Sequence, residues 1–134
     1  MTTAERLAKV ERELAEIKAG RAVADEVRAR RLVLVDDEGR ERAMLDMDED
    51  GPGLSLFDEN GKARAVLAAS TDGPVLSLFD ETGKERAMLG VAADGTGLVL
   101  GDATEKTRVQ LDVTEDGPRL VLLDAAEKVI WSAP

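Results

Sequence analysis

Apolar and polar residues follow two different periods along this chain, and the change falls near residue 30. From residue 3 to about residue 30 the chain is rich in Ala, Glu, Arg, Lys and Leu and contains no proline, and apolar residues recur every three or four positions as far as Ile17. Beyond residue 30 apolar residues alternate with polar ones, as in strands. The pattern predicts a helical segment over residues 1–30 and a mainly β domain over residues 31–134.

The helical segment carries a heptad stripe formed by Leu7, Val10, Leu14 and Ile17. Leu occupies both a positions and a β-branched residue both d positions, a choice that favours three or four strands in a coiled coil. Thr3 is the predicted N-cap. The flanking g and e positions pair opposite charges across a parallel interface: Arg6 with Glu11, and Glu13 with Lys18. We therefore expect an oligomerisation helix, with a helix folded back onto its own domain as the alternative.

The stripe does not continue in register beyond these two heptads. Arg21 falls on the next a position, so the stripe can resume at Ala24 and Val27 only after a slip near Gly20.

The β segment is an internal repeat of 22 residues without insertion or deletion. Four full units and a shorter fifth cover residues 31–52, 53–74, 75–96, 97–118 and 119–134. The second and fourth residues of every unit are Leu, beginning with Leu32 and Leu34 and ending with Leu120 and Leu122. Each unit therefore begins with a strand that has one invariant apolar face.

An Asp follows this strand in every unit and a second strand comes after it. The Asp column is Asp36, Asp58, Asp80, Asp102 and Asp124, and the residue three places later is Gly in the first three units and Glu in the last two. Asp accepts backbone N–H groups in tight turns and Gly permits a positive φ, so this motif predicts a hairpin. Each full unit then ends in Asp-Gly-Pro or Asp-Gly-Thr. Five such units predict nine or ten strands.

One face of this predicted sheet is wholly apolar and has to be covered, because an uncovered sheet of this kind is not stable in water. Three identical chains supply the cover if their Leu faces turn toward a common axis, which gives a trimeric β-prism continuous with the coiled coil. A closed single-chain barrel with the Leu residues inside is a second arrangement. A parallel β-solenoid is a third, although short Asp-to-Gly turns favour antiparallel hairpins.

The combination of an N-terminal coiled coil with Gly53-Leu54-Ser55-Leu56-Phe57-Asp58 and Gly97-Leu98-Val99-Leu100 resembles the trimeric shaft proteins of viral and phage fibres. The D-x-x-G-K/R-x-R-A hairpins also resemble those of uncharacterised bacterial repeat proteins. The resemblance implies a fibre-like trimer, although the viral shaft repeats are shorter than 22 residues.

Composition excludes most catalytic chemistry. The chain has no His, Cys or Tyr, so it lacks the residues of a Ser-His-Asp or Cys-His centre and of a thiolate or imidazole zinc site. Asp46-x-Asp48-x-Asp50-Gly51 matches the first half of a calcium loop, but its twelfth position is Phe57 instead of a bidentate Glu. We therefore expect no enzyme activity, no catalytic residues, no metal ligands and no cofactor.

Charge also bears on partners. Residues 1–30 hold seven basic and six acidic side chains, whereas residues 31–134 hold eleven and twenty-two. An acidic body of this kind disfavours nucleic acid and anionic membrane surfaces as partners. No apolar stretch resembles a signal peptide or a membrane span. A cytoplasmic location is the default expectation, with a virion or export by another route left open.

Three functions fit these observations. The first is a non-enzymatic homo-oligomeric shaft or scaffold, favoured as a homotrimer over a tetramer, that presents a surface or tip to a protein or surface partner. The others are a monomeric barrel that binds an apolar small molecule and a scaffold subunit whose helix docks on another protein.

The candidate interaction surface comprises Phe57, Phe79, Met44, Met88 and Trp131. Arg42, Arg64, Arg86 and Arg108 form a column expected to make cross-strand ion pairs with the Asp column.

Overall fold

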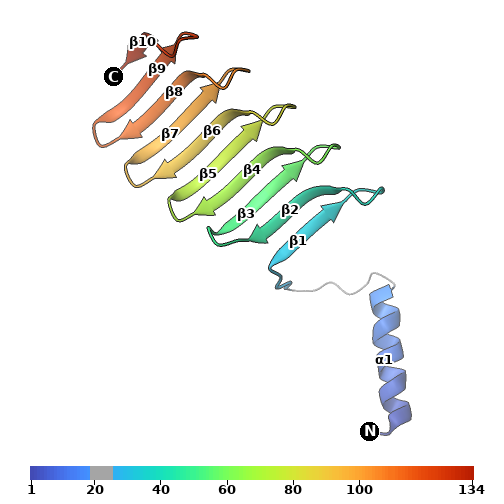
Figure 1. Ribbon diagram of the computed structural model, residues 1–134. Coiled ribbons are helices and arrows are strands. Elements are labelled where there is room, and N and C mark those ends of the chain that lie inside the picture. The colour runs from blue at the N-terminus through green and yellow to red at the C-terminus, as the bar shows by residue number, and fades with distance from the viewer. Residues whose placement is uncertain (19–25) are drawn as a thin grey trace.

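The computed structural model describes residues 1–18 and 26–134, which form one helix and ten strands (Figure 1). The helix, α1, spans Thr3–Lys18. The strands are β1 (Arg31–Val35), β2 (Glu41–Met47), β3 (Pro52–Phe57), β4 (Ala63–Ser70), β5 (Gly73–Phe79), β6 (Glu85–Ala92), β7 (Gly95–Gly101), β8 (Thr107–Thr114), β9 (Gly117–Leu123) and β10 (Val129–Ala133).

The N-cap and the length of α1 differ from the sequence prediction. Thr2, and not Thr3, caps the helix, because its Oγ1 accepts the Glu5 N–H at 3.3 Å while the Glu5 carboxylate accepts the Thr2 N–H. Residues 26–30 are not helical, so the prediction of a helix reaching about residue 30 was wrong over that stretch. The resumption of the stripe at Val27 was wrong for the same reason, and Ala24 and Gly20 lie outside the described residues.

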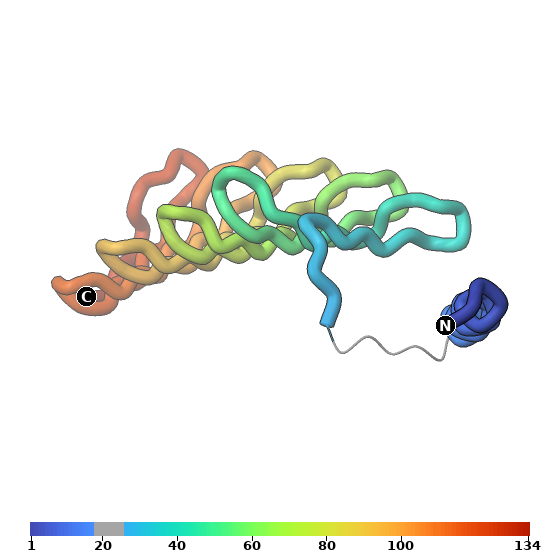
Figure 2. The backbone as a smooth tube through the Cα atoms, turned by 90° about the horizontal axis from the view of Figure 1, so that it is seen from below, coloured from blue at the N-terminus to red at the C-terminus, as the bar shows by residue number. Residues whose placement is uncertain are grey.

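The ten strands form one antiparallel sheet in which every strand pairs with its neighbours in sequence. The β-hairpin repeat is therefore confirmed, and the antiparallel pairing excludes the parallel solenoid. In the described part of the chain, β1 pairs only with β2 and β10 only with β9, so the closed single-chain barrel is also wrong. Figure 2 shows the hairpins stacked one behind another in a single layer.

Each Asp of the repeat organises the hairpin turn that follows it. In the second unit, Asp58 Oδ1 accepts the N–H groups of Asn60 and Lys62 at 2.9 and 3.0 Å, and its backbone carbonyl accepts the Gly61 N–H at 3.1 Å. The φ of Gly61 is 76°. Glu105 and Glu127 take the same left-handed conformation at the equivalent positions, with φ of 64° and 59°. The turn thus keeps its shape without Gly because the Asp hydrogen bonds define it.

The second type of turn connects one unit to the next and packs closely against the neighbouring turn. Gly73, with φ of 125°, begins β5 in such a turn. A Cβ at this position would overlap the carbonyl oxygen of Val91 in the next unit. Gly is therefore required at this position both for the positive φ and for the close stacking of successive units.

The sheet has almost no interior of its own. Among the described residues, Val121 is the one apolar side chain that is buried, with 5% of its surface exposed. The chain exposes 10383 Å² in total. A compact monomer of this mass would expose about 6,800 Å², so the extended sheet and the helix leave a large excess of accessible surface.

Candidate interaction surfaces

The sheet has one apolar face, here called the Leu face, whose side chains lie in rows that run across the strands. The central row consists of residues that oppose one another in the strand register: Leu32, Leu45, Leu54, Leu67, Leu76, Leu89, Leu98, Leu111 and Leu120. Ala133 of β10 completes this row opposite Leu120. The predicted invariant Leu positions therefore lie side by side on nine successive strands.

Two further rows flank the central one on the Leu face. The row nearer the Asp turns alternates large and small side chains: Leu34, Ala43, Leu56, Ala65, Leu78, Ala87, Leu100, Val109, Leu122 and Trp131. The row nearer the unit-connecting turns comprises Met47, Pro52, Ala69, Pro74, Val91, Thr96, Val113 and Pro118. Thr96 is the one polar member of these rows.

The Leu face is open to solvent in the isolated chain. Leu67 is 50% exposed and Leu34 is 69% exposed. Backbone groups of β2 to β9 are paired on both sides through the ladder, so on these strands the missing contacts are those of apolar side chains. The Leu face is therefore a contiguous apolar surface. Monomeric soluble proteins rarely expose an apolar patch that extends over so many strands, and their exposed apolar residues are usually scattered.

The opposite face, here called the mixed face, is better covered. Met44, Phe57, Phe79 and Met88 lie on this face and are each half-buried. Trp131 does not join them, because its ladder partner Leu122 places it on the Leu face, where it is 49% exposed. The five residues of the candidate interaction surface thus lie on two faces of the sheet.

A shallow hollow of about 440 Å³ lies on the mixed face. Its floor is formed around Gly90 and Gly97, which oppose each other on β6 and β7, and Met88 and Val99 contribute to its wall. Small residues at the centre and longer ones around it account for its shape.

The apolar stripe of α1 is likewise exposed. Leu7, Val10, Leu14 and Ile17 have exposed fractions of 59%, 58%, 48% and 65%. The adjacent helix surface is charged, with an ion pair of 3.8 Å between Lys9 Nζ and Glu13 Oε1. The helix therefore presents one apolar and one charged side, as the heptad pattern predicts.

The predicted pairing of the Arg and Asp columns is present, and the sequence interpretation missed a second role of the Arg residues. The guanidinium of each Arg lies 3.4–3.7 Å from the Asp carboxylate of its own unit. Three of them also donate through Nε to a strand-end carbonyl of the next unit: Arg42 to Phe57, Arg64 to Phe79 and Arg86 to Gly101, at 2.9–3.2 Å. The column therefore joins successive units.

Lys residues at a fixed turn position make similar links between units. Lys62 Nζ donates to the Glu81 carbonyl and Lys84 Nζ to the Ala103 carbonyl, both at 2.9 Å. Lys106 Nζ contacts Glu127 Oε2 at 2.9 Å. The sequence signal for these links is a basic residue that recurs every 22 residues. If the Asp is counted as the first residue of each turn, this basic residue is the fifth.

Hydrogen bonding shifts the pKa of the turn carboxylates downward. Partial desolvation is the largest influence on Asp36 and raises its pKa, but hydrogen bonds from the Arg40 side chain and from the Arg40 and Glu38 N–H groups outweigh it and lower the pKa to about 2. The Lys62 N–H is the main cause of the lowered pKa of Asp58. The Thr82 and Thr104 hydroxyls do the same for the pKa values of Asp80 and Asp102. These Asp residues are structural anions of the turns.

In the calcium-like motif, Asp48 accepts hydrogen bonds from backbone groups of the turn in which it lies. Asp48 Oδ1 accepts the N–H groups of Asp50 and Gly51 at 2.9 and 3.0 Å. Asp46 belongs to β2, where it opposes Gly53. Within residues 1–18 and 26–134 no three acidic side chains converge in the way a bound metal ion requires.

Comparisons with known proteins add no relative. Neither a protein-family model nor a curated protein sequence matches the chain. In the described part of the chain, no helix combines the length and the apolar character needed to cross a membrane.

Proposed function

We propose that this chain is a non-enzymatic homo-oligomeric structural or interaction protein in which other copies of the chain cover the Leu face. The observation that carries this proposal is the row of Leu residues opposed on nine successive strands and left open to solvent. Burial of apolar surface contributes about 25 cal/mol per Å², so covering such a face gives a strong driving force for association.

Uniformity of the Leu face favours the chain itself as its cover. Every full unit presents Leu at the same three positions of the repeat, the second, fourth and fifteenth, so a second sheet of the same spacing matches it layer by layer. A ligand cavity needs a shaped apolar pocket with a few directed polar groups, which these rows do not provide. The sheet is also open, which removes the basis for the barrel that would bind an apolar small molecule.

A trimer is the favoured assembly. Leu at a positions with Val or Ile at d positions of α1 favours three or four strands in a coiled coil. Three sheets with their Leu faces toward one axis make a β-prism, and four would make a four-sided body. Ten strands spaced about 4.8 Å apart make each side roughly 45 Å long, consistent with a stiff shaft like those of the fibre proteins that the sequence resembles.

The shaft would present the mixed face outward. Phe57, Phe79, Met44 and Met88 lie on this face beside polar residues. A protein or surface partner would be recognised there or at an end of the shaft, and Trp131 would contribute to the covered side of the last strand.

A pair of variants on one strand tests this proposal. Leu76 and Ser77 are neighbours in β5 and point to opposite faces, so Leu76→Asp places a charge on the Leu face and Ser77→Asp places one on the mixed face. We expect Leu76→Asp to weaken self-association at least tenfold in sedimentation velocity, and Ser77→Asp to sediment as the unmodified protein does. The proposal would be contradicted if the unmodified chain and both variants all sediment as monomers. It would also be contradicted if Leu76→Asp assembles as fully as the unmodified chain.

The exposed stripe of α1 favours one alternative function, in which the helix docks on a different protein. The Leu14→Ser variant distinguishes this alternative from a homomeric coiled coil. Loss of the homo-oligomer at low concentration supports a homomeric coiled coil, whereas unchanged self-association assigns the stripe to another partner.

A further inference from the structure

The floor of the hollow on the mixed face is formed by two glycines that the backbone itself does not require. Gly90 and Gly97 oppose each other on β6 and β7, and neither has the positive φ of the turn glycines. Gly inside a strand weakens the strand, and it often marks a place where a ligand or another chain approaches the backbone closely. A Cβ at Gly90 would meet only ordinary contacts, with the Pro74 carbonyl and Val75 Cγ2 both at 3.9 Å. Packing within the chain therefore does not account for the missing side chain.

The equivalent positions of the other full units carry side chains. The sixteenth residue of the repeat is Asp46, Ala68 and Asp112 in the first, second and fourth units, and Gly90 in the third. Because Gly90 opposes a second Gly, the backbone lacks side chains over two adjacent strands between the third and fourth units. This row of the mixed face contains no other pair of opposed glycines.

The wall of the hollow combines apolar side chains with carboxylates. Val75, Met88 and Val99 supply apolar surface. The charged residues that line the hollow are Asp72, Asp94 and Asp112, and among its described lining residues none is Lys or Arg.

Asp112 places a carboxylate oxygen beside the glycine floor. Its Oδ1 lies 3.2 Å from the position that a Cβ at Gly97 would take. Its Oδ2 accepts hydrogen bonds from Gln110 Nε2 at 2.8 Å and from Arg119 Nη2 at 3.0 Å. Arg119 therefore offsets one of the three charges, while the hydrogen bonds among the described residues leave Oδ1 as an acceptor at the hollow.

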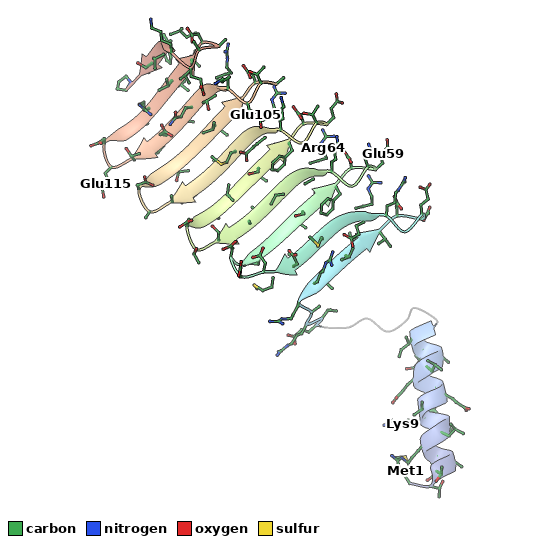
Figure 3. All side chains as sticks on the ribbon, viewed as in Figure 1. Met1, Lys9, Glu59, Arg64, Glu105 and Glu115 are labelled. Carbon is green, nitrogen blue, oxygen red and sulfur yellow. The ribbon has the colours of Figure 1, made fainter. Side chains whose placement is uncertain are left out.

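The surroundings of the hollow are also acidic. The unit-connecting turns at residues 48–51, 70–73, 92–95 and 114–117 contain seven Asp and Glu residues and no Lys or Arg. Figure 3 shows Glu115 at this end of the strands, and Glu59 and Glu105 at the other end. The local field therefore disfavours an anionic ligand and attracts a cation.

The hollow suits an extended organic cation better than a metal ion. No three acidic side chains converge around one point in residues 1–18 and 26–134, and a volume of about 440 Å³ is far larger than an ion needs. Arg is the side chain that matches both the charge and the floor. Its guanidinium is planar and weakly hydrated, so it can lie flat on exposed backbone, and its hydrocarbon stem packs on apolar surface.

We infer that the hollow binds an arginine side chain of a partner protein. The guanidinium would lie on the Gly90–Gly97 floor beside Asp112, and the stem would contact Met88 and Val99. This inference rests on the proposed function, because it specifies the partner chemistry of the face that the assembly presents outward. Since the hollow opens on the mixed face, covering the Leu face leaves it accessible.

A pair of peptides tests the inference on the isotopically labelled full chain. The probe is acetyl-Gly-Arg-Gly-amide, and the control peptide carries citrulline, which keeps the shape of arginine and lacks its charge. We expect the arginine peptide to shift the amide resonances of Gly90 and Gly97 saturably, and to bind at least fivefold more tightly than the citrulline peptide. Equal affinity of the two peptides would overturn the inference, and so would the absence of a saturable shift at these two glycines.

Matched variants separate the hollow from general acidic attraction. Gly90→Val fills the floor, whereas Ala68→Val adds bulk at the same repeat position outside the hollow. We expect Gly90→Val to weaken binding of the arginine peptide at least fivefold and Ala68→Val to change it less than twofold. Equal weakening by the two variants would contradict the site.

Asp112→Asn provides a test that leaves the floor unchanged. We expect it to weaken the arginine peptide at least threefold and to leave the affinity for the citrulline peptide unchanged, and unaltered binding of the arginine peptide would contradict the role of this carboxylate. Thermal unfolding verifies that each variant is folded, and the mass of each sample is measured first. An oligomeric mass without peptide binding contradicts only the arginine site, whereas a monomeric mass contradicts the proposed function itself.

Discussion

Arg64 Nε donates a hydrogen bond of 3.0 Å to the backbone carbonyl of Phe79, which lies fifteen residues further along the chain. The same guanidinium lies 3.6 Å from the carboxylate of Asp58 in its own turn. One side chain thus connects a turn of the second unit to a strand end of the third. Repetition of this contact couples neighbouring units, as in repeat proteins whose stability depends on nearest-neighbour interfaces.

Removing this connection should destabilise the sheet. Arg64→Met keeps the apolar stem and removes the donors, so we expect a loss of about 1 kcal/mol in the free energy of unfolding. Arg108→Met is the matched control, because Arg108 pairs with Asp102 at 3.7 Å while its Nη1 is buried without a hydrogen-bond partner among the described residues, and it has no link to the next unit. We expect a loss of only a few tenths of a kcal/mol there. Urea unfolding at one fixed protein concentration compares the two, and a larger loss in Arg108→Met would contradict the coupling role.

The unit-connecting turns provide a second comparison. Gly73 and Gly117 have similar φ values, 125° and 110°, but a Cβ at Gly73 would overlap the Val91 carbonyl, whereas a Cβ at Gly117 has no neighbour within 4 Å. We expect Gly117→Ala to cost about 1 kcal/mol from backbone strain. Gly73→Ala adds an overpacking cost of roughly 1–3 kcal/mol. Thermal unfolding measures the difference, and equal costs would show that the turns do not stack as described.

Acid should weaken the protein through the Asp turns. The pKa of Asp36 is lowered from 3.8 to about 2 in the folded chain, and those of Asp58, Asp80 and Asp102 are also lowered. Unfolded chains therefore bind protons before folded ones do. The stabilisation is fully present above about pH 5 and is lost as pH falls from about 4 toward 2.

Asp80→Asn tests this cause, because the amide oxygen still accepts hydrogen bonds but no longer titrates. We expect a shallower loss of the urea midpoint between pH 5 and pH 2 than in the unmodified chain. Glu59→Gln is the control, since it removes one exposed carboxylate that accepts no turn hydrogen bond among the described contacts. A slope in Asp80→Asn as steep as in the control would contradict the assignment.

Trp131 reports on coverage of the Leu face. It is the one Trp of the chain, and it lies opposite Leu122, 49% exposed in the isolated chain. Covering the Leu face by other copies should shift its fluorescence emission to shorter wavelength. Dilution and the Leu76→Asp variant should shift it back, and an emission spectrum that is insensitive to both would contradict burial of Trp131 in the assembly.

Much of the sheet could be predicted from the sequence because its information is local and repeated. The Leu alternation, the Asp turn and the 22-residue period together specify the strand pairs, and the register aligns Leu45 with Leu54 as this pattern requires. The Arg column was correctly paired with the Asp column, but its hydrogen bonds to the next unit depend on the distance between strand ends, which no local pattern encodes.

The helix shows where the sequence signal ends. The amphipathic stripe from Leu7 to Ile17 matches α1, whereas composition alone wrongly extended the helix over residues 26–30. Helix propensity is a weak signal where no apolar stripe supports it, and Val27 has lower propensity than the Ala and Leu of α1. The candidate surface was divided because it grouped residues by type. Trp131 occupies the repeat position of Ala43 and Ala65, which lies on the Leu face, and the register shift between Val129 and Trp131 recurs in the other Asp-turn hairpins.

The central claim is that other copies of the chain cover the Leu face, and the mass of the unmodified protein in solution tests it most directly. Light scattering on a sizing column should give about 43 kDa, three times the chain mass of 14.3 kDa. A fourfold mass would retain self-coverage in a four-sided body. A species of 14.3 kDa at micromolar concentration would contradict the account, because the Leu face would then remain uncovered in a folded monomer.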